Sequence, residues 1–158
     1  AWWNYIVFLF DCEDGMAAKK KKPIGKLVDS IATRLQLLVR LKAADDMGFC
    51  NCVSCGKLGH YKDMQGGHFI PRGTSFTKLM EENIHPQCAG CNGFGMKYGD
   101  AEKHYTLYMQ DMYGRDFVED LLAEKRAKRP HKWNRCVLDD MLIDINNQIK
   151  EHKKRVGE

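Results

Sequence analysis

Two pairs of cysteines, each with two residues between its members, have the most clearly defined chemistry in this sequence. Cys52 and Cys55 form the first pair, and Cys88 and Cys91 form the second, after an interval of 32 residues. This spacing lets both sulfurs of a pair reach one tetrahedral zinc ion at about 2.3 Å, and two such knuckles complete a closed four-sulfur site. We therefore predict a structural zinc ion, with a redox-active dithiol as the alternative. Cys50 is a weaker candidate for the first ligand, because a single intervening residue fits a knuckle less well.

Three polar residues lie within and just after the interval between the knuckles, and their types suit the hydrolysis of a phosphodiester. Near neutral pH this reaction needs a base to activate water, a divalent cation to stabilise the developing charge, and a group that aims the base. His68 is the candidate base, because imidazole titrates near neutrality. Asn92 offers a hard amide oxygen for Mg²⁺ or Mn²⁺, and Asn83 can brace the loop that positions His68. Taken singly, each residue is more often an ordinary turn or hydrogen-bonding residue.

The order of these residues resembles that of the HNH nucleases, a branch of the His-Me-finger family with a ββα-metal fold. In this sequence the pattern runs His68, Asn83, Cys88-x-x-Cys91 and Asn92, with steps of 15 and 9 residues between the three polar positions. The resemblance implies that His68 is the general base and that Asn83 holds the hairpin. It also implies that Asn92 binds the catalytic Mg²⁺ or Mn²⁺ ion.

A longer set of motifs is similar to the lambda NinG (Rap) family of phage recombination endonucleases. The set comprises Cys52-Val53-Ser54-Cys55-Gly56, Gly67-His68-Phe69, Asn83-Ile84-His85-Pro86-Gln87-Cys88, Cys91-Asn92, Gly99 and Tyr105. The similarity runs from about Leu35 to the C-terminus and is dense only from Cys52 to Asp100. It implies a structure-specific endonuclease that acts on branched DNA such as Holliday junctions and D-loops. Symmetric resolution of a junction needs two cuts, which leaves a homodimer open.

One position departs from the pattern of many HNH enzymes. They carry an acidic residue or a histidine directly before the base, as a second ligand of the catalytic metal, whereas this sequence has Gly67. Either Asn92 holds the ion with water in the remaining positions, or another residue contributes. The candidates for that residue are Asp63, His85 and Asp100.

Hydrophobic periodicity predicts the elements that must position these residues. Apolar residues at three- and four-residue steps predict a helix from about Leu27 to Asp46. Frequent Gly, Pro, Cys and His residues between 49 and 100 predict a small hairpin and a short helix around the metal. Helices are expected over 101–113 and 116–128, and Asn134 is expected to cap the last helix. The expected fold class is α+β, with a zinc-bound ββα-metal core and flanking α-helices.

The chain of 158 residues fits one small domain with helical extensions. We divide it into a segment expected to be a non-native or upstream extension without function (1–15), a basic arm and helix (16–48), the zinc-stapled nuclease core (49–100) and a C-terminal helical region (101–158). The apolar run in the first segment is too short to span a bilayer and lacks the features of a signal peptide, so no membrane association is expected. Paired knuckles favour a reducing compartment, and we expect a cytoplasmic location, in the host cell if a phage encodes the protein.

Positive charge is concentrated on both sides of the predicted core. The net charge is +4, with eight basic against three acidic residues in 16–46, six against one in 124–135, and seven against nine in 47–123. Basic segments on both sides of the core are typical of a protein that binds a phosphate backbone, although solvent-exposed helix faces explain each basic segment equally well. The candidate DNA-binding residues are Arg72, Lys125, Arg126, Lys128 and Arg129. Arg72 follows His68 by four residues and could clamp a phosphate, with a surface salt bridge as the alternative.

Two other functions remain open at this point. The first is a non-catalytic zinc-ribbon module that binds DNA without cutting it. The second is an HNH nuclease of a packaging, restriction or homing type, which would cut linear duplex DNA in preference to branched DNA.

Overall fold

The computed structural model describes residues 22–158 and has a mixed α+β architecture. The expectations for residues 1–15 and for the first part of the basic arm lie outside these residues. The elements before the second cysteine knuckle are α1 (Ile24–Ala43), β1 (Phe49–Asn51), β2 (Leu58–His60), β3 (Gln65–His68), the 3-10 turn η2 (Glu81–Asn83) and β4 (Ile84–Gln87). The elements after it are the π-helical turn η3 (Cys91–Gly95), α2 (Met96–Tyr98), α3 (Ala101–Tyr113), α4 (Arg115–Ala127) and α5 (Arg135–Arg155).

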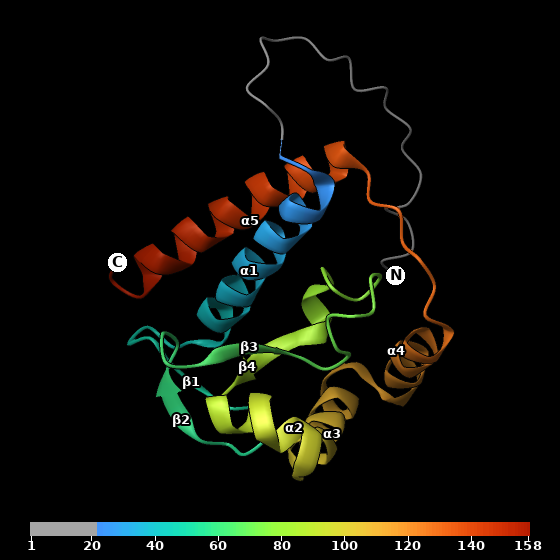
Figure 1. The fold of residues 1–158 in the computed structure, drawn as a ribbon. Coiled ribbons are helices and arrows are strands. Elements are labelled where there is room, and N and C mark those ends of the chain that lie inside the picture. Colours follow the sequence, from blue (N-terminus) through green and yellow to red (C-terminus); the bar gives the residue numbers. More distant parts are fainter. Residues whose placement is uncertain (1–21) are drawn as a thin grey trace.

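The strands form two antiparallel pairs, β1 with β2 and β3 with β4. The first pair is a hairpin whose turn carries the first cysteine knuckle. In the second pair, Gly67 lies opposite His85 and His68 lies opposite Ile84. This pair lies between two helical layers, with α1 on one face and the segment from η3 to α3 on the other (Figure 1). The end of β3 is therefore held from both sides.

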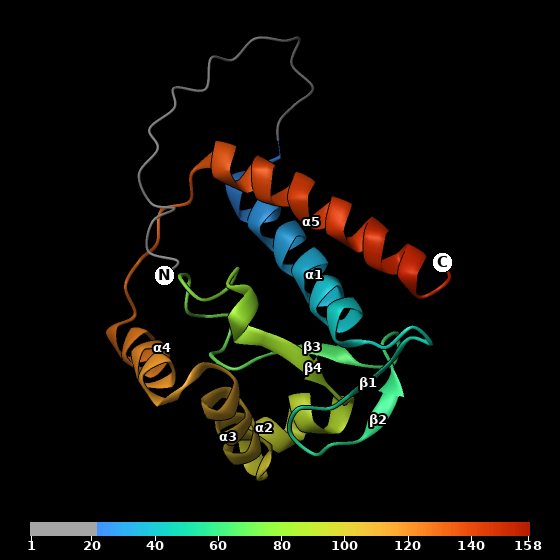
Figure 2. The same cartoon turned by 180° about the vertical axis from the view of Figure 1, so that it is seen from behind.

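The main core forms where α1 crosses α5, and both helices can be followed from the two opposite views (Figures 1 and 2). Both helices contribute buried apolar residues at helical spacing: Leu27, Ile31, Leu35 and Leu38 from α1, and Leu138, Ile145 and Ile149 from α5. Arg40 of α1 donates hydrogen bonds to the backbone oxygens of Tyr61 at 2.9 Å and Met64 at 2.7 Å. These bonds fix the chain that enters β3 against α1.

The first helix differs from the one that periodicity predicts. The helix expected from Leu27 to Asp46 begins and ends three residues earlier. It begins directly after Pro23, because proline supports the first turn of a helix but not its interior. It ends early because the Asp45 side chain accepts hydrogen bonds of 2.9 Å from the amides of Met47 and Phe49, which gives the backbone an alternative to the helix.

A second, smaller core joins the end of β3 to α3 and α4. It consists of the buried residues Phe69, Ile70, Tyr105, Met109, Val118 and Leu121. The helix predicted over 101–113 is confirmed with both its bounds, and the one predicted over 116–128 lies one residue earlier. The predicted cap is also confirmed, since the Asn134 side chain accepts a 2.8 Å hydrogen bond from the amide of Cys136.

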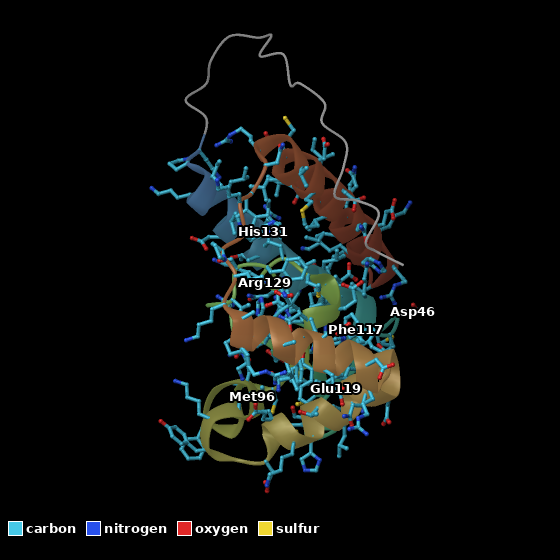
Figure 3. The ribbon with its side chains drawn as sticks, turned by 90° about the vertical axis from the view of Figure 1, so that its right-hand side faces the viewer. Asp46, Met96, Phe117, Glu119, Arg129 and His131 are labelled. Atoms are coloured by element: carbon cyan, nitrogen blue, oxygen red, sulfur yellow. The ribbon has the colours of Figure 1, made fainter. Side chains whose placement is uncertain are left out.

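Residues 128–134 connect α4 to α5 along one side of the molecule, where Arg129 and His131 lie (Figure 3). Lys128 adopts the left-handed conformation (φ 48°), which ends α4. None of the helices within residues 22–158 has both the length and the apolar character needed to cross a membrane.

Candidate metal centre and active-site cleft

The two cysteine knuckles meet at one point of the fold. The Sγ atoms of Cys52, Cys55, Cys88 and Cys91 all lie within 4.8 Å of one another, and those of Cys55 and Cys88 are 3.8 Å apart. Tetrahedral zinc with bonds of about 2.3 Å holds its sulfurs about 3.8 Å apart, so both the donor set and its spacing fit this ion. Cys50 is buried in β1 and is not a member of the cluster.

Asn83 is fully buried and ties together the loop between β3 and β4. Its Oδ1 accepts a 2.7 Å hydrogen bond from the amide of Ile70. Its Nδ2 donates to the backbone oxygens of Ile70 at 3.0 Å and Thr77 at 3.1 Å. The Phe69 amide, next to His68, donates to the Asn83 backbone oxygen at 2.8 Å. A single side chain thus fixes the position of the residues that follow His68.

Loss of the Asn83 amide should destabilise the fold strongly. Asn83→Ala leaves three buried backbone groups of Ile70 and Thr77 without a partner, and each hydrogen bond contributes about 1 kcal/mol with a further penalty for an unpaired buried group. We expect the free energy of unfolding of the zinc-loaded protein to fall by roughly 3 kcal/mol. Chemical denaturation measures it. The matched control is Asn146→Ala on the exposed face of α5, which should leave the unfolding midpoint nearly unchanged. A similar small effect for both variants would contradict the bracing role.

His68 is the last residue of β3 and is 9% exposed. Its Nε2 lies 3.2 Å from the backbone oxygen of Lys78, and because a carbonyl oxygen only accepts, Nε2 carries the proton. Nδ1 is then the unprotonated nitrogen. Burial lowers the pKa of His68 to about 4, so the imidazole is neutral near pH 7. The ring therefore has a free lone pair under the conditions in which a general base must act.

One cleft of about 430 Å³ brings together residues from distant parts of the sequence. His68 and Asn92 both line it, and so do the basic residues Arg72 and Lys125. Glu102 also lines it, a carboxylate that lies 4.0 Å from Lys125 Nζ. The remaining wall includes Met96, which is labelled in Figure 3. A candidate base, a candidate cation ligand and three basic side chains, the third being that of Lys97, thus share one surface.

The other three basic residues of the sequence analysis do not line this cleft. Arg126, Lys128 and Arg129 belong to the end of α4 and the connection after it. Arg129 forms a 2.7 Å ion pair with Glu124. A larger hollow of about 800 Å³ lies between α1, β1 and α3, but its lining includes neither the candidate base nor the candidate cation ligand.

The residues proposed to compensate for Gly67 do not line the cleft either. Both ring nitrogens of His85 are engaged, Nδ1 with Tyr105 Oη at 3.1 Å and Nε2 with Tyr113 Oη at 3.0 Å. Burial lowers the pKa of His85 to about 4, which keeps this ring neutral. Asp100 forms a 2.8 Å ion pair with Lys103 at the surface. Asp63 is exposed in the turn after β2, and it also lies outside the cleft.

Three residues of this region were missed from the sequence, and one of them is Lys97, a basic residue that lines the cleft. Glu102 lies on α3, and only the fold brings it to the cleft. Gln87 directly precedes Cys88 within one of the family motifs, but neither its residue type nor its position in the sequence indicates a chemical role. It is fully buried, and its Nε2 donates a 2.7 Å hydrogen bond to Ser54 Oγ inside the first knuckle.

The fold and site define a mixed α+β protein with a cluster of four cysteines that could hold a metal ion. Residues 14–156 match the family model described as Bacteriophage Lambda NinG protein. The chain therefore belongs to the bacteriophage lambda NinG family, which confirms the family resemblance of its motifs. No curated protein and no solved structure matches the chain.

Proposed function

We propose that this protein is a metal-dependent DNA endonuclease that hydrolyses phosphodiester bonds in branched recombination intermediates. The observation that carries the proposal is the convergence of His68 and Asn92 on one cleft with Arg72 and Lys125. In the sequence, Asn92 and Lys125 lie far from His68 and Arg72. A purely structural zinc module has no need for a neutral, buried histidine beside a basic cleft.

The role of His68 follows from its hydrogen bond. With Nε2–H donating to the Lys78 carbonyl, Nδ1 accepts the proton of the attacking water. Its low pKa keeps this nitrogen unprotonated, while Asn83 and the second core hold the end of β3 in place. The base is therefore oriented before substrate binds.

The phosphate is bound and oriented by charged side chains. The guanidinium of Arg72 has the fork geometry for two phosphate oxygens, and Lys125 adds a second positive charge in the same cleft. Asn92 would hold a Mg²⁺ or Mn²⁺ ion through its amide oxygen, since its Nδ2 is engaged by Gln65 Oε1 at 2.7 Å. When bound, such an ion stabilises the negative charge that develops on the phosphate oxygens.

Two further features support an HNH-type mechanism. The strands β3 and β4 are followed by the helical segment of η3 and α2, which is the element order of a ββα-metal motif. The structural zinc would anchor the junction between β4 and η3. Membership of the NinG family supports a phage recombination role. Branched DNA is then the proposed substrate and the host cytoplasm the proposed place of action, and a homodimer would provide the two cuts that symmetric resolution of a junction needs.

One assay tests this function against its alternatives. Purified, zinc-loaded protein is incubated with linear, forked and four-way DNA, in Mg²⁺ or in EDTA. We expect nicking of the four-way and forked DNA in Mg²⁺ only. Preferential cutting of linear duplex would indicate a packaging, restriction or homing type of nuclease. Binding without cutting in Mg²⁺ and in Mn²⁺ would favour the zinc-ribbon module.

The cleft also predicts how binding depends on salt. Each phosphate contact that a protein neutralises contributes about 0.9 to the slope of log affinity against log salt concentration. Lys125→Gln should therefore lower the magnitude of the slope for a four-way junction by about 0.9. Lys154→Gln, an exposed residue of α5, is the control and should leave it unchanged. Equal slopes for Lys125→Gln and the unsubstituted protein would place the DNA-binding face elsewhere.

A further inference from the structure

The side chain of Gln87 contains a buried oxygen with no partner. Within residues 22–158, Gln87 Oε1 and Gln36 Nε2 are the buried side-chain polar atoms that make no hydrogen bond. Buried polar groups in folded proteins are nearly always paired, so an unpaired one calls for a physical explanation. An amide oxygen is also a preferred ligand of hard divalent cations.

The orientation of this amide is fixed by the first cysteine knuckle. The Ser54 hydroxyl donates its single hydrogen to the backbone oxygen of Ala101 at 3.0 Å. The Ser54 Oγ atom can therefore only accept a hydrogen bond from Gln87, and the donor at 2.7 Å must be the amide nitrogen Nε2. The oxygen of Gln87 must then point the other way, and the zinc knuckle that carries Ser54 keeps it there.

The oxygen points at the position where Gly67 lacks a side chain. A Cβ atom on Gly67 would lie 1.8 Å from Gln87 Oε1 and 2.9 Å from Asn92 Oδ1. Because both distances are measured from the same Cβ position, the two oxygens can be no farther apart than these two distances added together. Octahedral Mg²⁺ with bonds of about 2.1 Å places pairs of ligand oxygens about 3.0 to 4.2 Å apart, within that limit.

Asn92 is oriented in the same manner as Gln87. Its Nδ2 donates to Gln65 Oε1 at 2.7 Å, so the oxygen end of the amide faces Gly67. Two amide oxygens, each fixed by a hydrogen bond from its own nitrogen, thus converge on the position of Gly67, which directly precedes His68, and of their two side chains that of Asn92 also lines the cleft. The glycine before the base leaves the space that both of them use.

We propose that Gln87 Oε1 is the second protein ligand of the catalytic divalent cation and binds it together with Asn92 Oδ1. This inference rests on the proposed function and deepens it. Gln87 takes the place of the side chain that is missing at Gly67. Two neutral oxygen ligands select Mg²⁺ or Mn²⁺ over a thiolate-preferring ion, and leave the other positions to water and substrate phosphate.

The test measures cation binding directly, apart from cleavage. Zinc-loaded protein is titrated with Mn²⁺ and the bound ion is followed by electron paramagnetic resonance, while nicking of four-way DNA is assayed in Mg²⁺. Gln87→Met, which keeps the length of the side chain but has no oxygen, should weaken Mn²⁺ binding by at least about 10-fold. Gln87→Glu keeps the oxygen and adds charge, so it should bind Mn²⁺ at least as tightly as the unsubstituted protein.

Two further variants separate this role from a general loss of packing. Gly67→Ala should also weaken Mn²⁺ binding, because its Cβ would lie 1.8 Å from Gln87 Oε1 and force that oxygen to move. Gln36→Met is the matched control: Gln36 is the other residue with an unpaired buried amide atom, and it lies against Gly66 and not against Gly67. It should bind Mn²⁺ normally. Zinc content and the unfolding midpoint of each variant show that it is folded.

The outcomes distinguish this inference from the proposed function. Normal Mn²⁺ binding by folded Gln87→Met, in a protein that nicks DNA, overturns the ligand role and leaves the nuclease intact. If Gln87→Met does not fold, the other two variants decide. The ligand role of Gln87 is overturned if Gln87→Glu binds Mn²⁺ more weakly than the unsubstituted protein while Gly67→Ala binds Mn²⁺ normally. Absence of both Mn²⁺ binding and nicking in the unsubstituted protein overturns the proposed function itself.

Discussion

His68→Ala should cut four-way DNA about 10² to 10⁴ times more slowly than the unsubstituted protein, a loss of about 3 to 5 kcal/mol of transition-state stabilisation. The substitution removes the Nδ1 lone pair that accepts the proton of water. It leaves the four cysteines, the Asn83 brace and the basic cleft side chains in place. Single-turnover nicking of a labelled junction measures the effect. Binding of the junction in a gel should stay close to that of the unsubstituted protein.

Two other substitutions test the same mechanism, one at the proposed metal ligand and one as a control. Asn92→Ala should be comparably slow, but higher Mn²⁺ should restore part of its activity, because water can replace a lost ligand while nothing replaces the lost base. His131→Ala is the control: this histidine lies in the connection before α5, with its ring centroid 4.3 Å from that of Trp133 (Figure 3). It should cut normally. Cleavage by His68→Ala within a few fold of normal would show that His68 is not the general base and would exclude the HNH mechanism proposed for this cleft.

The parts of the fold that were predictable from sequence depend on local signals. The cysteine site follows from spacing alone, since two residues between ligands set the geometry of a knuckle whatever surrounds it. The helix over 101–113 has a regular apolar face, and the side chain of Asn134 caps its own helix. In each case the residues that carry the signal, the two cysteines of a knuckle, the apolar face of a helix or its cap, lie within a few positions of one another.

The parts that were not predictable depend on contacts between distant residues or on one competing hydrogen bond. The hydrogen bonds that the Asp45 side chain accepts determine where α1 ends, and the periodicity of apolar residues carries no information about them. His85 has the chemistry of a metal ligand, but two tyrosines from α3 occupy both its nitrogens. Gln87 appears ordinary in sequence until the fold places its oxygen against Gly67. Proximity of this kind needs a tertiary structure.

The same reasoning explains why the basic residues divide into two groups. Lys125 and Arg126 are neighbours in sequence, but successive residues of a helix point about 100° apart, and the cleft receives only Lys125. Charge counts along the chain identify a basic segment and do not resolve which of its side chains share a face. The pairing of Arg129 with Glu124 reduces its availability further.

Cys88→Ser should have the largest effect on stability of any substitution considered. Cys88 directly follows β4, and a metal at the four-cysteine site would tie this strand and η3 to the hairpin of β1 and β2. Structural zinc contributes roughly 10–16 kcal/mol to the folding of small zinc domains, as much as the total stability of a typical domain. With three thiolates left, we expect Cys88→Ser to lose its zinc and the ordered packing of residues 49–100.

The measurements are zinc per chain by elemental analysis, near-ultraviolet circular dichroism and the thermal midpoint. The unsubstituted protein should hold about one zinc, and a strong chelator should reproduce the effect of Cys88→Ser. Cys50→Ser is the matched control: this thiol is buried in β1 but lies outside the cluster. It should keep its zinc and lose only a modest part of its stability, because a hydroxyl replaces a small apolar group. A folded Cys88→Ser protein with an unchanged midpoint, or a Cys50→Ser protein without zinc, would show that the ligands have been wrongly assigned.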